Sequence, residues 1–282
     1  MLILVLTMIA QILLGGFILL LLMLYETSKT FRYYIKMTVY YFHLNFVCIA
    51  PIFTGIFYYG RTTKNQRIVA MYMKHVKKLF GIEMEVRGED NLKSAQPCII
   101  VCNHQSSVDL MGMMEIWPDN CTVLAKKELL YTGIFGVALY YSDILFVDRK
   151  RTGKAVNYMQ NVAEEVKKQK LSVFIFPEGT RNRNGTLLPF KKGAFHLAVE
   201  AGVPILPIVF SSLSAFYSKD EKRFDSGKMI ITCLPKISTE GLTTDDIPDL
   251  TEKAREQMLD VFYKTSLETT DPKYLCNGLK SQ

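Results

Sequence analysis

The sequence predicts an α/β domain, with a largely parallel sheet flanked by helices, that follows N-terminal membrane helices. The first sixty of the 282 residues hold almost no charge. From Gly81 onward, short apolar runs alternate with longer amphipathic ones, which is typical of strands joined by crossover helices. We therefore divide the chain into N-terminal membrane segments (1–60), a basic amphipathic helix (61–80) and a main domain (81–282).

Two apolar segments make up the N-terminal part. Leu2–Tyr25 is long enough to cross a bilayer, and without a basic start or a small-residue cleavage site it does not fit a signal peptide. Met37–Gly60 is also uncharged but rich in tyrosine and phenylalanine, which favours the headgroup level. This second segment can span, enter one leaflet, or pack as a buried core helix.

The positive-inside rule favours one crossing. We expect a loop over Glu26–Lys36, and its basic residues and those of Arg61–Lys78 both belong in the cytosol. If both apolar segments crossed the membrane as a hairpin, the two basic stretches would lie on opposite sides, although helical hairpins of this kind do occur. We therefore expect Leu2–Tyr25 to cross once, and the second segment to bend at Pro51 and Gly55 and return to the cytosol. The 61–80 helix can lie on an anionic membrane surface, pack on the domain, or do both.

In the main domain, each apolar run is interpreted as a strand and each longer amphipathic run as a helix. The predicted strands are Glu83–Val86, Cys98–Cys102, Thr122–Ala125, Ile144–Val147, Ser172–Phe176, Ile205–Val209 and Met229–Leu234. The predicted helices are Val108–Glu115, Ile134–Tyr141, Thr152–Lys168, Gly193–Ala201 and Thr251–Leu267.

Composition narrows the classes of function. The formal net charge of +7 suits a partner that carries phosphate. A nucleic acid is not favoured, because the only basic helix with interleaved aromatics adjoins the apolar N-terminus. The six cysteines include no C-x-x-C pair, so neither a zinc site nor a thioredoxin-like site is predicted. Cys98 and Cys102 share one strand face, where we expect buried free thiols.

A histidine and an aspartate follow the second predicted strand. The sequence Asn103-His104-Gln105-Ser106-Ser107-Val108-Asp109 places His104 at the carboxyl end of the strand, where open α/β sheets bind ligands. Across a strand-to-helix corner, Asp109 can fold back to the imidazole and fix its tautomer. No G-x-S-x-G motif is present. The pattern favours a base acting on a substrate hydroxyl, although a corner that only bonds its own backbone is the alternative.

A second polar turn follows the strand at Ser172–Phe176. The sequence Pro177-Glu178-Gly179-Thr180-Arg181 combines a glycine that allows close approach with an arginine suited to phosphate. Alone it is a common loop composition. Basic residues also stand at other predicted strand ends or before a helix, and together they indicate a positive mouth around His104: Lys126-Lys127, Arg149-Lys150-Arg151 and Lys191-Lys192.

Taken together, these motifs resemble the 1-acylglycerol-3-phosphate acyltransferase family of glycerolipid acyltransferases. The resemblance runs from about Gly81 to Leu234. It includes the two motifs above, Phe146-Val147-Asp148-Arg149 between them, and Val203-Pro204-Ile205-Leu206-Pro207 after them. Ala125-Lys126-Lys127-Glu128-Leu129 and Pro189-Phe190-Lys191-Lys192-Gly193-Ala194-Phe195 also match.

The resemblance implies that His104 and Asp109 activate the hydroxyl of lysophosphatidic acid, and that the Val203–Pro207 block lines the acyl or acceptor pocket. It implies acyl-coenzyme A as a co-substrate, with no bound cofactor or metal, and an endoplasmic reticulum protein whose catalytic domain faces the cytosol. The implied phosphate-binding residues are Glu178, Gly179, Thr180 and Arg181, assisted by Lys126, Arg149 and Lys191.

Two other functions stay open on the sequence. One is acylation of a different lysophospholipid, which acceptor competition would distinguish. The other is nonenzymatic lipid binding, against which the intact His104, Asp109 and Arg181 argue. Acyl-chain preference and oligomeric state do not follow from the sequence.

Overall fold

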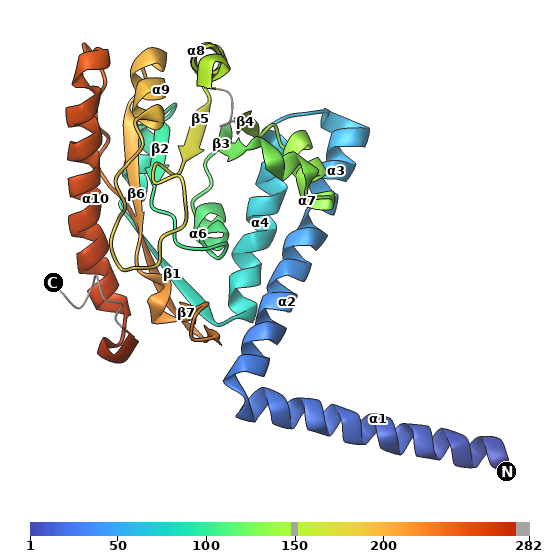
Figure 1. Ribbon diagram of the computed structural model, residues 1–282. Coiled ribbons are helices and arrows are strands. Elements are labelled where there is room, and N and C mark those ends of the chain that lie inside the picture. The colour runs from blue at the N-terminus through green and yellow to red at the C-terminus, as the bar shows by residue number, and fades with distance from the viewer. Residues whose placement is uncertain (148–151, 275–282) are drawn as a thin grey trace.

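A seven-stranded sheet forms the centre of the computed structural model, which describes residues 1–147 and 152–274, with the backbone alone for 152–158 (Figure 1). The strand order is β1-β9-β6-β2-β5-β3-β4, and every pairing is parallel except β6 with β9. This confirms the predicted largely parallel sheet. The strands are β1 Ile82–Arg87, β2 Ile99–Cys102, β3 Cys121–Lys126, β4 Leu145–Val147, β5 Ser172–Ile175, β6 Ile205–Phe210 and β9 Gly227–Cys233.

Helices cover both faces of this sheet, and all five predicted helices of the main domain are present. Two of them, α7 (Ile134–Tyr141) and α9 (Gly193–Ala201), have the predicted bounds. One face carries α2 (Lys29–Val47), α4 (Lys64–Leu79) and α6 (Asp109–Glu115), and the other carries α8 (Thr152–Gln169), α9 and α10 (Ile247–Thr269) (Figure 1). Shorter helical elements are α5 Glu89–Ser94, η2 Lys127–Tyr131, η3 Leu213–Ala215, η4 Thr244–Asp246 and η5 Pro272–Tyr274.

Strand β2 lies at the middle of the sheet and fixes the position of the polar corner that follows it. It pairs in parallel with both β5 and β6, with Ile99 opposite Val173 on one side and Ile205 on the other. Its residues are fully buried, as a strand covered on both faces requires. Cys98 and Cys102 are buried free thiols, as predicted.

The first helix, α1 (Leu2–Thr27), projects away from the domain and has no buried residue (Figure 1). The next helix, α2 (Lys29–Val47), begins two residues later, after Ser28 caps its first turn. The expected loop over Glu26–Lys36 is therefore wrong. The basic residues in that stretch do not end the helix, because lysine and arginine are good helix formers.

The second apolar segment continues as helix through α3 (Ile49–Thr54) and the π-helix η1 (Gly55–Tyr59). The helix is interrupted only at Cys48, near Pro51, which has no N–H to donate to the preceding turn. The chain does not reverse at Pro51 or Gly55, so the expected bend is wrong. Both α1 and the Lys29–Tyr59 helix are long and apolar enough to cross a membrane.

One face of α2 belongs to the core of the main domain. Its buried side chains share a hydrophobic cluster with the sheet, so residue 60 does not separate two independent bodies. The large apolar area that α2 buries fixes its orientation on the domain. The residues that it contributes are Tyr33, Met37, Tyr40, Leu44 and Val47.

The basic amphipathic segment forms α4 (Lys64–Leu79) and packs on the domain. Its buried residues include Val69, Met73 and Val76. Lys77 also forms a 2.7 Å ion pair with Glu115 of α6. Because much of its apolar face is covered by protein, the basic side chains of α4, with the exposed Met71 and Leu79, remain for solvent or an anionic surface.

A short antiparallel pair, β7 (Tyr217–Ser218) and β8 (Arg223–Phe224), was not predicted. This hairpin lies against the start of α2. The ammonium group of Lys36 lies 5.8 Å from the ring centre of Phe224, and that of Lys222 lies 5.7 Å from the ring centre of Tyr33. The hairpin thereby brings the loop after β7 beside the predicted site.

Candidate active site

The corner after β2 brings His104 and Asp109 together as predicted. The Nδ1 atom of His104 lies 2.7 Å from Oδ2 of Asp109, which begins α6. The same oxygen accepts the backbone N–H groups of Gln105 and Ser106 at 2.6 and 2.9 Å. Asp109 is 1% exposed. It therefore stays in place as the corner's cap while it orients the imidazole, and Nε2 is left to meet a substrate.

Asn103 fixes the other side of this corner. Its side-chain amide exchanges two hydrogen bonds with the backbone of Phe210 at the end of β6, at 3.0 and 2.8 Å. Gln105 continues the contact, accepting the N–H of Leu213 and donating to the carbonyl of Ser211. These bonds extend the sheet beyond its last ladder pair, so the polar corner is rigid although it is not a strand.

The turn after β5 holds the backbone of His104 from both sides. Glu178 accepts the His104 N–H through Oε1 and the Leu188 N–H through Oε2, both at 2.9 Å. The N–H of Asn182 donates to the His104 carbonyl at 2.8 Å. Burial raises the pKa of the Glu178 carboxyl, and the two N–H donors oppose that rise. Glu178 is therefore placed to hold the base rather than to contact a substrate.

Gly179 allows the turn to close against a lysine. It has a φ of +70°, which favours glycine, and a Cβ here would lie 2.8 Å from Nζ of Lys191. The N–H of Lys191 also bonds to the carbonyl of Pro177 at 2.8 Å. The structure thus places Lys191 beside this turn, as predicted.

Arg181 lines a polar pocket that also receives two cations absent from the predicted set, Arg183 and Lys219. No carboxylate among the described residues forms an ion pair with Arg181, so its guanidinium is available to an anion. We call this the cationic pocket; its other lining residues are Tyr33, Tyr34, Met37, Thr38, Tyr41, Ser106, Ser107 and Tyr217.

An apolar cavity lies next to the same corner. The ring of Phe176 stacks on that of His104, with the ring centres 4.2 Å apart, and Phe176 also lines this cavity. Ser106 and Ser107, which follow His104 in the corner, line the cationic pocket, so the corner that holds the base adjoins both hollows. The cavity's walls come from α2, α3, α4, α6, β3, η2 and α7, and include Leu44, Val69, Met113, Ala125, Leu129, Phe135, Ala138 and Leu139.

The other predicted residues within the described part of the chain do not line these two hollows. Lys126 is exposed at the carboxyl end of β3, and Thr180 is exposed beside Arg181, but neither lines a described pocket. Arg149 lies outside the described residues. The Val203–Pro207 block lines neither hollow, because Ile205–Pro207 belongs to the central strand β6 and is buried in the sheet. Its pocket role stays a prediction.

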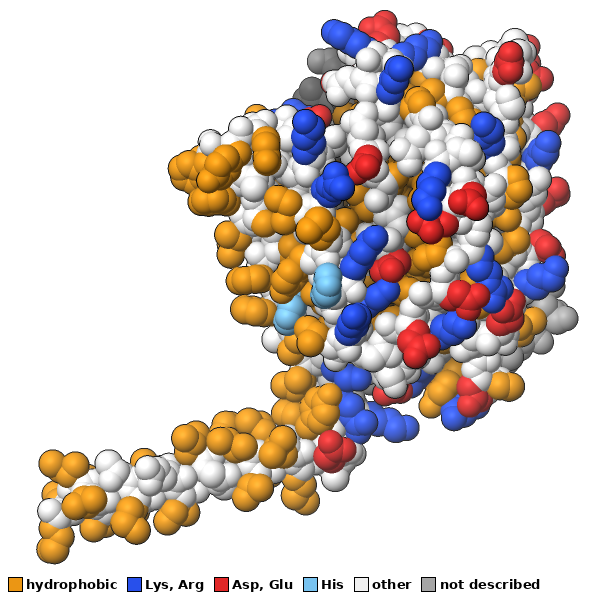
Figure 2. All heavy atoms as spheres, turned by 180° about the vertical axis from the view of Figure 1, so that it is seen from behind, with side chains coloured by type: hydrophobic (Ala, Val, Ile, Leu, Met, Phe, Trp, Pro, Cys, Tyr) orange, Lys and Arg blue, Asp and Glu red, His pale blue; other side chains and the backbone are white. Residues whose placement is uncertain are grey.

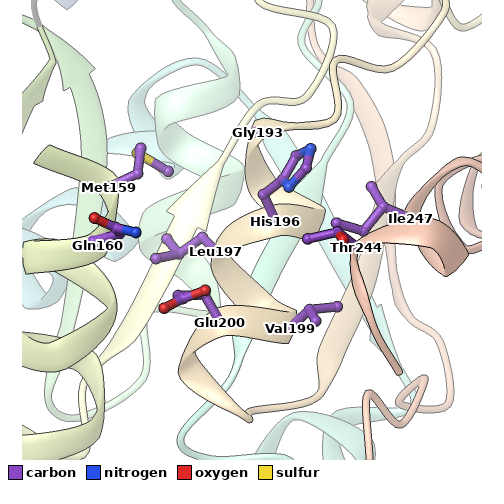
Figure 3. A pocket seen from close by; sticks show the side chains of 9 residues that line it. All are labelled: Met159, Gln160, Gly193, His196, Leu197, Val199, Glu200, Thr244 and Ile247. Atoms are coloured by element: carbon purple, nitrogen blue, oxygen red, sulfur yellow. The ribbon is translucent and has the colours of Figure 1, made fainter. Parts of the chain in front are cut away.

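A further hollow lies on the opposite face of the sheet, between α8, α9 and the start of α10 (Figure 3). His196 and Glu200 of α9 stand at its edge with the apolar side chains of Met159 and Ile247. It shares no residue with the cationic pocket or the apolar cavity, so we assign the chemistry to the hollows beside His104.

Comparison with known proteins agrees with this site. Residues 83–211 match the family model described as Acyltransferase, a range that includes both polar turns. The chain is 47% identical over 246 residues to the mouse 1-acyl-sn-glycerol-3-phosphate acyltransferase alpha, covering 87% of this chain and 86% of that protein. The chain belongs to the 1-acyl-sn-glycerol-3-phosphate acyltransferase family.

Other members of this acyltransferase family show the same relationship. The human beta protein is 41% identical over 90% of this chain and 91% of its own length. The 1-acyl-sn-glycerol-3-phosphate acyltransferase of Saccharomyces cerevisiae is 42% identical over 71% of this chain and 67% of its own. The crystal structure of the 1-acyl-sn-glycerophosphate (LPA) acyltransferase of Thermotoga maritima has the same fold, with a TM-score of 0.59, 21% identity, and coverage of 82% of this chain and 95% of that one.

Proposed function

We propose that this acyltransferase moves a fatty acyl group from acyl-coenzyme A to the sn-2 hydroxyl of lysophosphatidic acid, giving phosphatidic acid and free coenzyme A. The observation that carries the proposal is that the His104 corner adjoins both hollows: Ser106 and Ser107 line the cationic pocket, and Phe176, stacked on His104, lines the apolar cavity. One hollow suits a phosphate and the other a hydrocarbon chain, and the base stands where an acceptor hydroxyl and a donor thioester would meet.

The reaction needs no nucleophile from the protein. Nε2 of His104 takes the proton of the acceptor hydroxyl as its oxygen attacks the thioester carbonyl carbon. Asp109, bonded to Nδ1, stabilises the imidazolium that forms. The carbon–sulfur bond then breaks, and the imidazolium returns the proton to the departing thiolate. The new ester leaves with the acceptor, and the histidine is neutral again.

The cationic pocket accounts for the choice of acceptor. A phosphate monoester carries close to two negative charges at neutral pH and three equivalent oxygens. Arg181 can bind two of these oxygens at once, while Arg183 and Lys219 add charge at the same pocket. A choline or ethanolamine headgroup would bring a cation toward three cations. The pocket therefore favours lysophosphatidic acid over lysophospholipids with larger zwitterionic headgroups.

Acceptor and donor assays test the proposal. Purified full-length protein in detergent or vesicles is given acyl-coenzyme A or acyl carrier protein thioester with a series of lysophospholipids. We expect phosphatidic acid from acyl-coenzyme A and lysophosphatidic acid, with lower kcat/KM for every other acceptor. Faster acylation of lysophosphatidylcholine, or use of the carrier-protein donor alone, would contradict the assignment.

We also propose that α1 crosses the endoplasmic reticulum membrane once and leaves the catalytic domain in the cytosol. The contacts between the start of α2 and the β7–β8 hairpin support this, because they hold Lys36 against the domain on which the basic helix α4 also packs. The positive-inside rule favours the cytosol for both basic stretches. Acyl-coenzyme A is soluble in the cytosol and would reach His104 directly.

Glycosylation tests this orientation. A sequon placed on a spacer before Met1 should be modified if α1 crosses once, because the N-terminus then lies in the lumen. The native sequon Asn184-Gly185-Thr186 should stay unmodified. The other sequon, at Asn120, is less informative because its amide donates to the carbonyls of Gln169 and Lys170. A glycosidase-sensitive mass shift abolished by Asn184→Gln would put the domain in the lumen.

A further inference from the structure

Helix α7 is apolar on two opposite faces. On one face, Phe135, Ala138 and Leu139 line the apolar cavity. On the other, Ile134, Val137 and Tyr140 are 53%, 44% and 47% exposed, and Tyr131 of η2 is 77% exposed. The spacing of three residues puts Ile134, Val137 and Tyr140 on this outer side of α7, and Tyr131 precedes them at the end of η2. We call these four residues the outer row. A helix that is apolar all round normally has protein or lipid on both sides.

The row is held rigidly to the end of the second apolar helix. The carbonyl of Tyr141 accepts the Thr62 N–H at 3.0 Å and the Asn65 amide at 2.8 Å. Nε of Arg61 forms a 2.6 Å ion pair with Asp143, and its guanidinium carbon lies 5.2 Å from the ring centre of Tyr140. Helix α7 and the turn after η1 therefore form one unit.

This unit presents one continuous apolar surface. The neighbouring residues Ile56, Phe57 and Tyr58 are 56%, 67% and 70% exposed. Seen from behind, apolar side chains cover the edge of the molecule that holds α2 and α3 (Figure 2). Exposed apolar surface on this scale indicates an interaction site. Basic residues lie next to it in the chain, at Arg61 and Lys64 on one side and at Lys126 and Lys127 on the other.

We propose that the outer row of η2 and α7, formed by Tyr131, Ile134, Val137 and Tyr140, inserts into the membrane leaflet that holds the α3–η1 end of the second apolar helix. Lipid is the occupant because the row is continuous with a helix apolar enough to cross a membrane, and because tyrosines and flanking cations suit the headgroup boundary. The catalytic domain thus has a membrane contact of its own, far in sequence from the N-terminal helices.

The contact has a consequence for the apolar cavity. Helix α7 becomes a wall shared between that cavity and the leaflet. The width of this one helix then separates the hydrocarbon region of the membrane from the cavity. Phe176, which stacks on His104, lines the same cavity. This consequence depends on the proposed function, whereas insertion of the row itself does not.

Depth measurements test the insertion without turnover. Full-length protein with Val137→Cys is labelled with an environment-sensitive fluorophore and reconstituted into phosphatidylcholine–phosphatidylserine vesicles with brominated acyl chains. The matched control is Leu267→Cys on α10, 50% exposed at the opposite edge of the molecule (Figure 1). Cys276 is replaced by serine in both, since the five described cysteines are buried.

We expect the label at 137 to be quenched by brominated lipid several times more strongly than the label at 267. Equal quenching at the two positions would overturn the proposal. A label at 137 that is shielded from an aqueous quencher but untouched by brominated lipid would assign the row to a protein contact, and would also overturn it.

A functional comparison tests the consequence. Val137→Asp, with Leu267→Asp as its control, puts a charge into the proposed lipid contact, where a charge is strongly unfavourable. We expect kcat/KM for a long-chain acyl-coenzyme A, with lysophosphatidic acid in vesicles, to fall at least about fivefold, with little change for a short-chain acyl-coenzyme A. An equal loss with both donors, or no loss with either, would contradict the shared wall. If neither donor is a substrate of the unmodified protein, the proposed function fails while the quenching result stands.

Discussion

The buried carboxylate of Glu178 accepts the backbone N–H of His104 at 2.9 Å, so the turn after β5 holds the base that follows β2. The Asn182 N–H completes the hold at the His104 carbonyl. The corner that contains His104 and the turn that contains Glu178 are about seventy residues apart in the chain, but together they hold the backbone of the base in place. Glu178 works through His104 and is a positioning residue, whereas Arg181, three residues later, faces the cationic pocket.

Substituting Glu178 tests this division. In Glu178→Gln, a single amide oxygen replaces two accepting oxygens, so one buried N–H loses its partner at a cost of about 1–3 kcal/mol. We expect a lower Tm and a lower kcat, with little change in the KM for lysophosphatidic acid. Glu200→Gln, at an exposed position of α9, serves as the control. An unchanged Tm with a raised acceptor KM would instead make Glu178 a substrate contact.

The role of Arg181 is tested by a change that keeps the charge. Arg181→Lys loses the planar fork that binds two phosphate oxygens. Losing one charge-assisted hydrogen bond of roughly 1.5 kcal/mol should raise the KM for lysophosphatidic acid by about tenfold. The KM for acyl-coenzyme A should stay the same. Steady-state kinetics with each substrate varied in turn measures both. An effect confined to the donor would move Arg181 to the coenzyme side.

Lys219 should contribute to the same pocket. Lys219→Met keeps the stem and removes the charge, and we expect the KM for lysophosphatidic acid to rise by a factor of about five, as for a partly exposed ion pair of roughly 1 kcal/mol. Its effect should weaken with added salt. Lys264→Met on α10 is the matched control. If Lys219→Met and Lys264→Met had the same KM for lysophosphatidic acid, Lys219 would not be part of the phosphate-binding site.

The apolar cavity should limit the length of the donor's acyl chain. Ala125 of β3 lines it, on the same side of the strand as Val123. In Ala125→Leu, the larger side chain displaces about three methylenes, each worth roughly 0.8 kcal/mol. We expect kcat/KM to shift at least tenfold or so toward lauroyl over oleoyl donors. Ala125→Ser, nearly equal in volume, should keep the original profile. If Ala125→Leu kept the chain-length preference of the unmodified protein, the donor's acyl chain would bind outside this cavity.

Much of the fold follows from local pattern. The seven sheet strands and five of the six α-helices described in the main domain were predictable, because each is an apolar run of characteristic period, bounded by polar turns; the six-residue α5 was not predicted. The contact between His104 and Asp109 was predictable because five residues span one strand-to-helix corner. These features depend on residues near one another in the chain.

What was missed depends on distant parts of the chain. The β7–β8 hairpin has two residues in each strand, too few to show a period, so Lys219 could not be placed. The inner face of α2 looks like part of a membrane segment because lipid and a protein core both select apolar residues. The role of Glu178 was missed because a carboxylate that binds backbone N–H groups has the same sequence signature as one that binds a substrate.

The central claim is that His104, oriented by Asp109, takes the proton of the acceptor hydroxyl. Asp109→Asn should reduce kcat severely, since an asparagine favours the wrong tautomer of the imidazole. It also keeps an oxygen that can accept the Gln105 N–H, so the corner should still fold.

The most direct measurement is the rate of phosphatidic acid formation by purified His104→Ala with acyl-coenzyme A and lysophosphatidic acid. The variant should be expressed and associate with membranes normally, because His104 itself is held through its backbone. We expect turnover at least about a hundredfold below that of the unmodified protein, the usual contribution of a general base. Turnover close to normal in a correctly folded His104→Ala protein would contradict the mechanism.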